Sequence, residues 1–137
     1  AEVEGQAGCR ELLEALAANG CRLGILTRNT RANALLSLER LGVLDLFVEA
    51  DVLGRDEAAP KPDPDGILRL LDAWRAAPER GVMVGDFRLD LEAGRNAGVR
   101  TVHFHDGSRG SAMPWPELTD LSVTSLHDLR AAALPGR

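Results

Sequence analysis

The stretch from Gly81 to Gly94, GVMVGDFRLDLEAG, constrains the fold more than any other part of the sequence. It begins with an apolar run, Val82 to Val84, that is typical of a buried strand, and a helical pattern follows Gly85. A strand that turns into a helix is the repeating unit of a parallel α/β sheet. The stretch therefore predicts an α/β fold and places Asp86 at the carboxyl end of a strand.

Asp86 and Asp90 lie four residues apart in this stretch, a spacing that brings side chains to one face of a helix. Two carboxylates so placed repel each other unless a cation lies near them, and oxygen ligands beside a substrate phosphate suit Mg²⁺. The structural alternative makes Asp86 a helix N-cap and Asp90 a solvated acid of the first turn. An isolated pair of this kind favours the structural alternative, so the other motifs have to decide.

The rest of the chain repeats the alternation of helix and strand. Helices are expected over residues 9–19, 30–41, 63–77, 89–97 and 125–134. Strands are expected over residues 21–27, 46–50, 82–84 and 100–104, with a small edge strand near Val123. This order predicts a mostly parallel sheet with right-handed crossovers, in which ligands bind beyond the carboxyl ends of the strands. Thr27 and Asp86 fall at such ends, and the helix that starts after Lys61 is expected on the same side.

Size and composition limit the class of protein. The 137 residues are enough for one domain with a core, and 45% of them are hydrophobic. The formal charge is −5 without a basic block, which argues against a nucleic-acid partner or an anionic membrane surface. No apolar run is long enough to span a bilayer. Cys9 and Cys21 fit buried, reduced side chains, so a cytoplasmic protein is expected.

Thr27, Lys61 and the Asp86–Asp90 pair supply the groups that a phosphate site needs. A hydroxyl and nearby backbone N–H groups bind phosphoryl oxygens, an ammonium offsets charge that builds up during transfer, and carboxylates hold a metal. Prolines on both sides of Lys61 restrict its backbone, so positioning the ammonium costs little conformational entropy.

The motifs LTRN, PKPDP and GDFRLD, in this order, resemble the haloacid dehalogenase-like hydrolase superfamily, especially its phosphoglycolate-phosphatase-like branch. A helix after LTRN, a helix start at K-P-D-P and the phrase N-A-G-V after the acidic motif add to the resemblance, which covers residues 5–105. It implies a Rossmann-like three-layer α/β/α core domain over residues 1–137, with no cap domain present.

By this resemblance Thr27 binds the phosphoryl group with help from the backbone of Arg28 and Asn29, and Lys61 steadies the attacking carboxylate and the phosphate. Judged from the residues alone, Asn29 is better explained as a helix cap and Arg28 as a solvated side chain.

The resemblance also implies a metal and a reaction. Asp86 would be a direct or near-direct Mg²⁺ ligand, and Asp90 would support the metal through water or through Lys61. The reaction would be the hydrolysis of a small phosphorylated metabolite through an aspartyl-phosphate.

One departure from the family pattern is large. Its first motif, an apolar strand that ends in Asp-x-Asp, has no match, and the sequence has Asp-x-Asp only at Asp63-Pro64-Asp65, a helix start that suits a nucleophile poorly. In the family that strand lies between the strands that carry Thr27 and Asp86. We therefore expect residues 1–137 to be the C-terminal part of a longer hydrolase, inactive alone. An N-terminal segment, a second copy of the chain or a rearrangement would have to fill the gap in the sheet.

Other functions compete with this interpretation. A non-catalytic phospholigand-binding or regulatory module would keep the phosphate site without the nucleophile. A signalling receiver domain also uses Asp, Thr and Lys with Mg²⁺, but it places its acids first, whereas the order here is Thr27, Lys61, Asp86. His103 and His105 share one strand face, yet two histidines without a third ligand are a weak metal motif.

Overall fold

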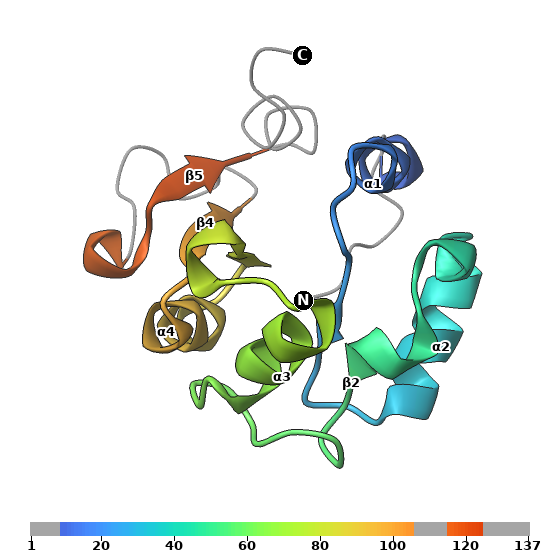
Figure 1. Cartoon of the computed structure of the whole chain (residues 1–137), viewed down its shortest axis with the longest axis horizontal. Helices are drawn as coiled ribbons and strands as arrows, with labels where there is room; N and C mark the ends of the chain where they lie inside the picture. Colours follow the sequence, from blue (N-terminus) through green and yellow to red (C-terminus); the bar gives the residue numbers. More distant parts are fainter. Residues whose placement is uncertain (1–8, 106–114, 125–137) are drawn as a thin grey trace. The chain divides into compact units, whose positions relative to one another are not determined.

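The structure is a computed structural model that describes residues 9–105 and 115–124 (Figure 1). These residues divide into two compact units: the first covers 9–58 and the second covers 59–105 and 115–124. Each unit is an α/β assembly with parallel strands, so the predicted fold class and strand direction are confirmed. Within the described residues, every helix is too short or too polar to cross a bilayer.

The first unit is built around a two-stranded parallel ladder. Its elements, in chain order, are α1 (Cys9–Ala18), β1 (Ile25–Leu26), α2 (Arg31–Arg40), the 3₁₀ helices η1 (Leu44–Leu46) and η2 (Glu49–Asp51), and β2 (Val52–Leu53). Ile25 pairs with Val52, and the N–H of Thr27 donates to the carbonyl of Leu53, which continues the ladder.

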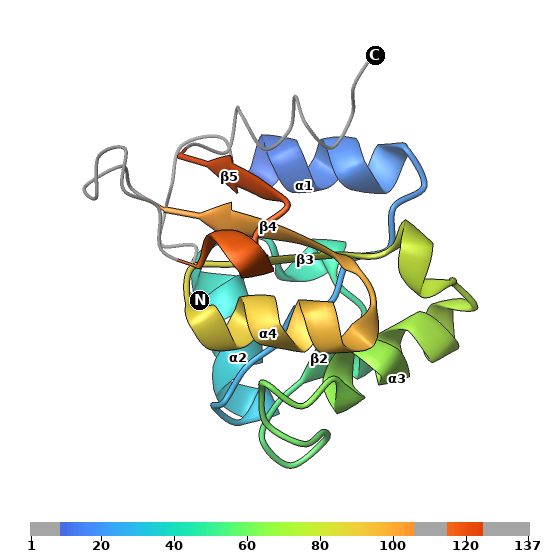
Figure 2. The ribbon, with the colours of Figure 1, turned by 90° about the vertical axis from the view of Figure 1, so that its left-hand side faces the viewer.

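The second unit is built around a three-stranded parallel sheet in the order β3-β4-β5. Its elements are α3 (Asp65–Trp74), η3 (Pro78–Arg80), β3 (Val82–Gly85), α4 (Arg88–Ala97), β4 (Arg100–Phe104), η4 (Pro116–Leu118) and β5 (Leu121–Val123). Figure 2 shows α4 lying alongside the strands. The side chains of Leu91 and Ala93 on this helix are fully buried.

Close packing of α4 on the sheet depends on Gly94. A Cβ at this position would lie 2.7 Å from Thr101 Cγ2 and 3.0 Å from Met83 Cβ, distances that real Cβ atoms avoid. The helix ends at Gly98, whose φ of 80° is left-handed, as the sequence predicts. This packing fixes the position of α4 relative to the end of β3.

The prediction of a strand over residues 46–50 is wrong. This segment forms parts of two 3₁₀ helices, and the strand is Val52–Leu53. The apolar side chains of Leu46 and Phe47 pack on the core cluster around Val43 without joining a ladder. A short apolar run marks burial, and burial alone does not distinguish a strand from a turn of helix.

The helix predicted over residues 63–77 is shorter at both ends. It begins at Asp65, with Pro64 at the N-cap, and it ends at Trp74 because Arg75 adopts a left-handed conformation with φ of 53°. Other predicted boundaries shift by smaller amounts, and the strand predicted over 21–27 is reduced to Ile25–Leu26. The predicted helix over 125–134 lies outside the described residues.

The strands of Thr27 and Asp86 belong to different sheets. Among the described residues, β1 pairs only with β2, and β3 pairs only with β4, so each of these two strands keeps one edge without a ladder. On β3, the side chains of Val82 and Val84 are exposed.

Candidate functional site

Lys61 and Asp90 form a buried ion pair in the second unit. Lys61 Nζ lies 2.5 Å from Asp90 Oδ1, and their side chains are only 10% and 6% exposed. The pair joins residues 29 positions apart in the sequence, the loop before α3 and the first turn of α4. The alternative interpretation of Asp90 as a solvated first-turn acid is therefore wrong.

Gly85 makes room for this pair. A Cβ on Gly85 would lie 2.2 Å from Asp90 Cβ and 2.6 Å from Asp90 Oδ2, so only glycine allows the carboxylate to lie over the end of β3. The φ of Gly85 is not in the left-handed region. The glycine is required here by the close approach of Asp90, and not by a left-handed backbone conformation.

Asp86 follows Gly85 and is exposed at the carboxyl end of β3. It is not the N-cap of α4, because that position belongs to Phe87, whose backbone N–H donates to Asp90 Oδ2 at 3.3 Å. The structural alternative for Asp86 is thus wrong as well. The guanidinium of Arg88 pairs with Glu92 on the same helix, with 3.1 Å between Nε and Oε1.

The loop that carries Lys61 is anchored at two points. Asn96 Nδ2 on α4 donates to the carbonyl of Pro62 at 3.0 Å. Asp65 Oδ2 accepts from the backbone N–H of Ala59 and from Arg69 Nε, each at 2.9 Å. The hydrogen bond from the Ala59 N–H is the main cause that lowers the pKa of Asp65 below its ordinary value, and the hydrogen bond from Arg69 adds to it. Asp65 thus closes the loop around Lys61 and stays ionised, a role that the sequence does not indicate.

Thr27 lies in the first unit, where the loop after β1 is folded on itself. The hydroxyl of Thr27 accepts from the N–H of Asn29 at 3.1 Å. A hydroxyl that accepts through a lone pair keeps its own hydrogen for another acceptor. Thr27 is half-buried and can still donate to a phosphoryl oxygen, whereas the N–H of Asn29 is already engaged.

Asn29 supports the loop but is not the helix cap. Its Oδ1 accepts from the N–H of Thr30 at 2.9 Å and from Asn33 Nδ2 at 2.8 Å. The N-cap of α2 is Thr30, whose side chain accepts from the N–H of Asn33. The interpretation of Asn29 as the cap is off by one residue, while Arg28 is exposed beside it, as the solvated interpretation expects.

A second glycine lies against the Thr27 loop. A Cβ on Gly54 would lie 2.5 Å from the backbone nitrogen of Arg31 and 2.7 Å from the carbonyl oxygen of Asn29. The N–H of Gly54 donates to Glu57 Oε1 at 2.7 Å. Gly54 and Glu57 position the loop after β2, and neither is marked by the motifs.

The predicted site residues fall into two groups. Lys61, Asp86 and Asp90 lie in the second unit, which brings Lys61 and Asp90 into contact, and Thr27 with its loop lies in the first. The meeting of the two groups on one rim stays a prediction, as do the roles assigned to their members.

The donor set fits a partial Mg²⁺ site. The oxygens of Asp90 accept from Lys61 and from the N–H of Phe87, so Asp86 is the carboxylate exposed for a metal. One carboxylate fits Mg²⁺, which binds through one or two carboxylates, waters and substrate phosphate. The described ranges contain no cluster of three or more His, Cys, Asp or Glu side chains that would hold a metal by itself.

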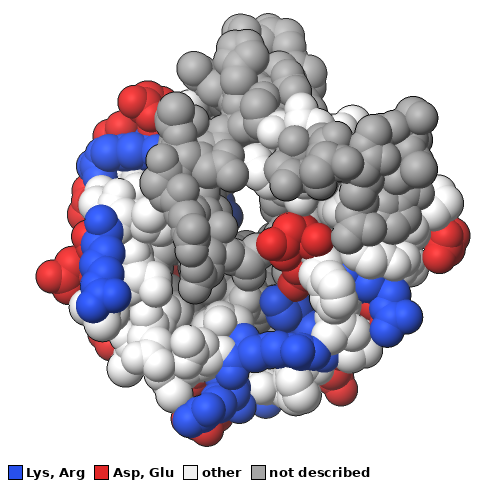
Figure 3. Space-filling view, turned by 180° about the vertical axis from the view of Figure 1, so that it is seen from behind, with Lys and Arg blue, Asp and Glu red and all other residues white. Residues whose placement is uncertain are grey.

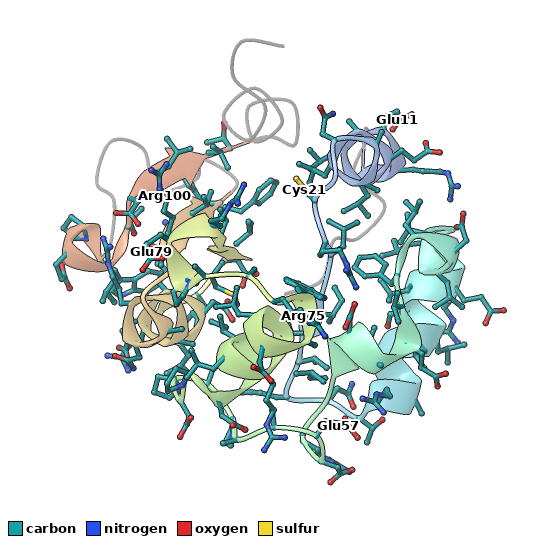
Figure 4. All side chains as sticks on the ribbon, viewed as in Figure 1. Glu11, Cys21, Glu57, Arg75, Glu79 and Arg100 are labelled. Carbon is teal, nitrogen blue, oxygen red and sulfur yellow. The ribbon has the colours of Figure 1, made fainter. Side chains whose placement is uncertain are left out.

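The remaining features outside the motifs are simpler. The His103 and His105 rings lie 5.1 Å apart without a third ligand among the described residues. Cys21 is exposed, which corrects the expectation that it is buried (Figure 4). On the face in Figure 3, Lys and Arg side chains are interspersed with Asp and Glu side chains.

The fold and the motif residues define a parallel α/β protein with an acidic motif at a strand end. The model of the haloacid dehalogenase-like hydrolase family matches residues 1–104, and the chain belongs to this family. Both the fold class and the resemblance predicted from the sequence are thus confirmed.

Named relatives point in the same direction. The chain is 41% identical over 96 residues to a phosphoglycolate phosphatase of Rhodospirillum rubrum, a match that covers 69% of this chain and 39% of the relative. It is 35% identical over 127 residues to the pyrophosphatase PpaX of Halalkalibacterium halodurans, covering 93% and 59%. It also resembles the crystal structure of a HAD family hydrolase from Deinococcus radiodurans with bound phosphate and sodium.

The comparison with the Deinococcus radiodurans structure gives a TM-score of 0.79 and an identity of 26%, and it covers 92% of this chain and 57% of the solved one. In all three comparisons the chain spans less than two thirds of the other protein's length.

Proposed function

We propose that the protein containing this chain is a Mg²⁺-dependent phosphohydrolase that acts on a small phosphorylated metabolite. The family, two relatives named as phosphatases and a structural neighbour that binds phosphate support this activity. The sequence composition supports a cytoplasmic location.

The observation that carries the proposal is the Lys61–Asp90 pair behind the exposed Asp86. The carboxylate of Asp90 fixes the ammonium of Lys61 in a nearly water-free position, where a charge acts more strongly than it would in bulk water. A preorganised ammonium can then offset the negative charge that develops on a phosphoryl group during transfer. In this arrangement Asp90 positions Lys61, and Lys61 is the group that reaches the phosphate.

The other roles follow from which groups are exposed. Asp86 would hold Mg²⁺, which when bound neutralises phosphate charge. Thr27 would donate its hydroxyl hydrogen to a phosphoryl oxygen, with the backbone at Arg28 nearby, whereas the amide of Asn29 would have to leave Thr27 before it could bind phosphate.

We propose further that residues 1–137 are the core part of a longer hydrolase without its nucleophile. The reaction would pass through an aspartyl-phosphate formed on an Asp from a preceding strand. Two observations support this: the relatives are longer than this chain, and β1 and β3 each keep an edge without a ladder within the described residues. A strand from a preceding segment, or from a second copy of the chain, would fit either edge.

The experiment is a turnover assay of the full-length protein with an aryl phosphate, with Mg²⁺ and after its removal by a chelator. Turnover should need Mg²⁺, Asp86→Asn should abolish it, and Lys61→Ala should lower kcat/KM by about 10²–10³-fold, the scale of one preorganised electrostatic group. Glu92→Gln is the matched control, because it removes a partly exposed carboxylate from α4, the helix that follows Asp86, and should leave turnover unchanged.

The assay also decides the competing function, a non-catalytic phospholigand-binding module that would keep the phosphate site without the nucleophile. Phosphate binding without turnover in the full-length protein would support that module. Unchanged turnover in Asp86→Asn would remove Asp86 from the metal site.

A further inference from the structure

A row of aromatic rings runs across the carboxyl ends of β3 and β4 in the second unit. The rings of His105 and His103 lie 5.1 Å apart, and those of His103 and Trp115 lie 5.4 Å apart. Trp115 meets Phe87 edge to face, with 5.6 Å between the centroids and 76° between the planes. The row therefore begins at His105, passes through the buried His103 and then Trp115, and ends at Phe87.

Phe87 is an unusual residue for its position. It is the N-cap of α4, where a side chain with an oxygen acceptor would stabilise the helix, and phenylalanine has none. Its residue surface is 54% exposed, so burial in the core does not explain it. Single exposed apolar residues are common, but this one is held by Trp115 in a continuous row of rings.

The backbone of Phe87 is tied to the proposed phosphate site. Its N–H donates to Asp90 Oδ2, and Lys61 binds the other oxygen of the same carboxylate. Phe87 also follows Asp86 directly in the sequence. The ring thus starts from a backbone position that is fixed relative to both the ammonium and the exposed carboxylate.

We infer that Phe87 and Trp115 form a platform that selects the part of the substrate beyond its phosphate, and that it favours a planar, apolar leaving group. This inference rests on the proposed phosphohydrolase function. An aryl group gains apolar burial and an edge or offset contact with the rings. A leaving group that is small or fully charged gains neither. Phe87 is then a specificity-determining residue, and Trp115 positions it.

The first test measures binding without turnover. Isothermal titration calorimetry of the full-length protein measures the Kd of two inert analogues, phenylphosphonate and methylphosphonate. Phenylphosphonate should bind about tenfold more tightly, in the range of one aromatic contact plus its apolar burial. Phe87→Ala should reduce this ratio to about twofold or less. Phe87→Tyr should keep it, and Phe87→Leu should fall between the two because the planar face is lost.

Leu68→Ala is the control, because Leu68 is also a large exposed apolar side chain, on α3 of the same unit. It should leave the ratio unchanged. A ratio that is the same in Phe87→Ala and in the parent protein overturns the inference, and so does a parent protein that binds the two phosphonates equally.

The second test separates this inference from the proposed function. With phenyl phosphate and methyl phosphate as substrates, Phe87→Ala should lower kcat/KM for the phenyl ester alone. Failure to hydrolyse either ester, with the binding ratio intact and sensitive to Phe87→Ala, would contradict the phosphohydrolase proposal but support the platform. Hydrolysis with equal losses on both esters would support the activity and overturn the platform.

Discussion

The loop of Thr27 and the pair of Lys61 and Asp90 use glycine in different ways. Gly54 lies against backbone atoms of the Thr27 loop, whereas Gly85 lies against the side chain of Asp90. The polar groups of the Thr27 loop are bonded mainly to near neighbours in the sequence. The Lys61–Asp90 contact instead joins distant segments and is buried.

This difference indicates how much the polar contacts of each region contribute to stability. The Thr27 loop is a local structure whose polar groups remain near water, so each of its hydrogen bonds contributes little to stability. The Lys61–Asp90 pair has lost most of its hydration, so each partner depends strongly on the other. Loss of a polar group should therefore cost much more in the second region, and the predictions for Asp90 and Thr30 test that ordering.

The largest effect is expected for Asp90→Asn. This change takes the carboxylate charge from a nearly buried ammonium, and breaking such a pair costs about 3–5 kcal/mol of unfolding free energy. Glu92→Gln in the same helix breaks a partly exposed i,i+4 ion pair with Arg88 and should cost about 0.3–0.5 kcal/mol. Urea unfolding of both variants measures the difference. Equal losses would show that burial of the pair is unimportant.

The two glycines give the next effect. A Cβ at either position overlaps neighbouring atoms, and overpacking of this kind costs about 1–3 kcal/mol. Gly54→Ala should be the more costly, because its neighbours are backbone atoms that move only with the whole loop. Gly85→Ala should instead displace Asp90 and lower the proposed phosphohydrolase activity of the full-length protein more than its stability. Urea unfolding and kcat/KM, measured for both variants, distinguish the outcomes. A Gly85→Ala protein with full activity would contradict the close fit of Asp90.

A smaller effect is expected in the Thr27 loop. Thr30→Ala removes the N-cap of α2 and should cost about 1 kcal/mol, while Thr30→Ser keeps the acceptor and should cost much less. Asn29→Ala leaves the cap in place and should cost less than Thr30→Ala. The reverse order in thermal or urea unfolding would restore Asn29 as the capping residue.

Much of the second unit could be predicted from the sequence, because its signals are local. The apolar run at Val82, the helix after it and the stop at Gly98 need only short-range rules. The residue types at Lys61 and Asp90 are equally visible in the sequence, but their contact is not.

Prediction from the sequence was wrong or incomplete where a contact between distant segments decides the structure. The strand predicted over 46–50 was displaced because the ladder partner of Ile25 is Val52. The anchor at Asp65 and the close approach behind Gly85 depend on groups that only the folded chain brings together. Spacing in the sequence carries no information on such contacts.

The smallest expected effect is on stability at acid pH. We compare one carboxylate from each unit. In the first unit, the guanidinium of Arg10 is the main cause that lowers the pKa of the exposed Asp45. In the second, the backbone N–H of Thr101, at 2.9 Å, is the main cause that lowers the pKa of Asp120, and Arg95 adds to it. A carboxylate with a lowered folded pKa contributes stability above its unfolded pKa of about 3.9. That contribution is lost as the pH falls through the folded value.

Asp45→Asn and Asp120→Asn should each remove part of the loss of stability between about pH 5 and about pH 3. Salt distinguishes the two, since the Debye length shrinks to about 3 Å at 1 M ionic strength. High salt should reduce the stability contribution of Asp45 by the larger fraction, because that contribution depends on an exposed ion pair with Arg10. The hydrogen bond from the Thr101 N–H to Asp120 should persist. Urea unfolding at both pH values, in low and high salt, measures these contributions. Equal salt sensitivity would mean that Arg95, and not the Thr101 amide, governs Asp120.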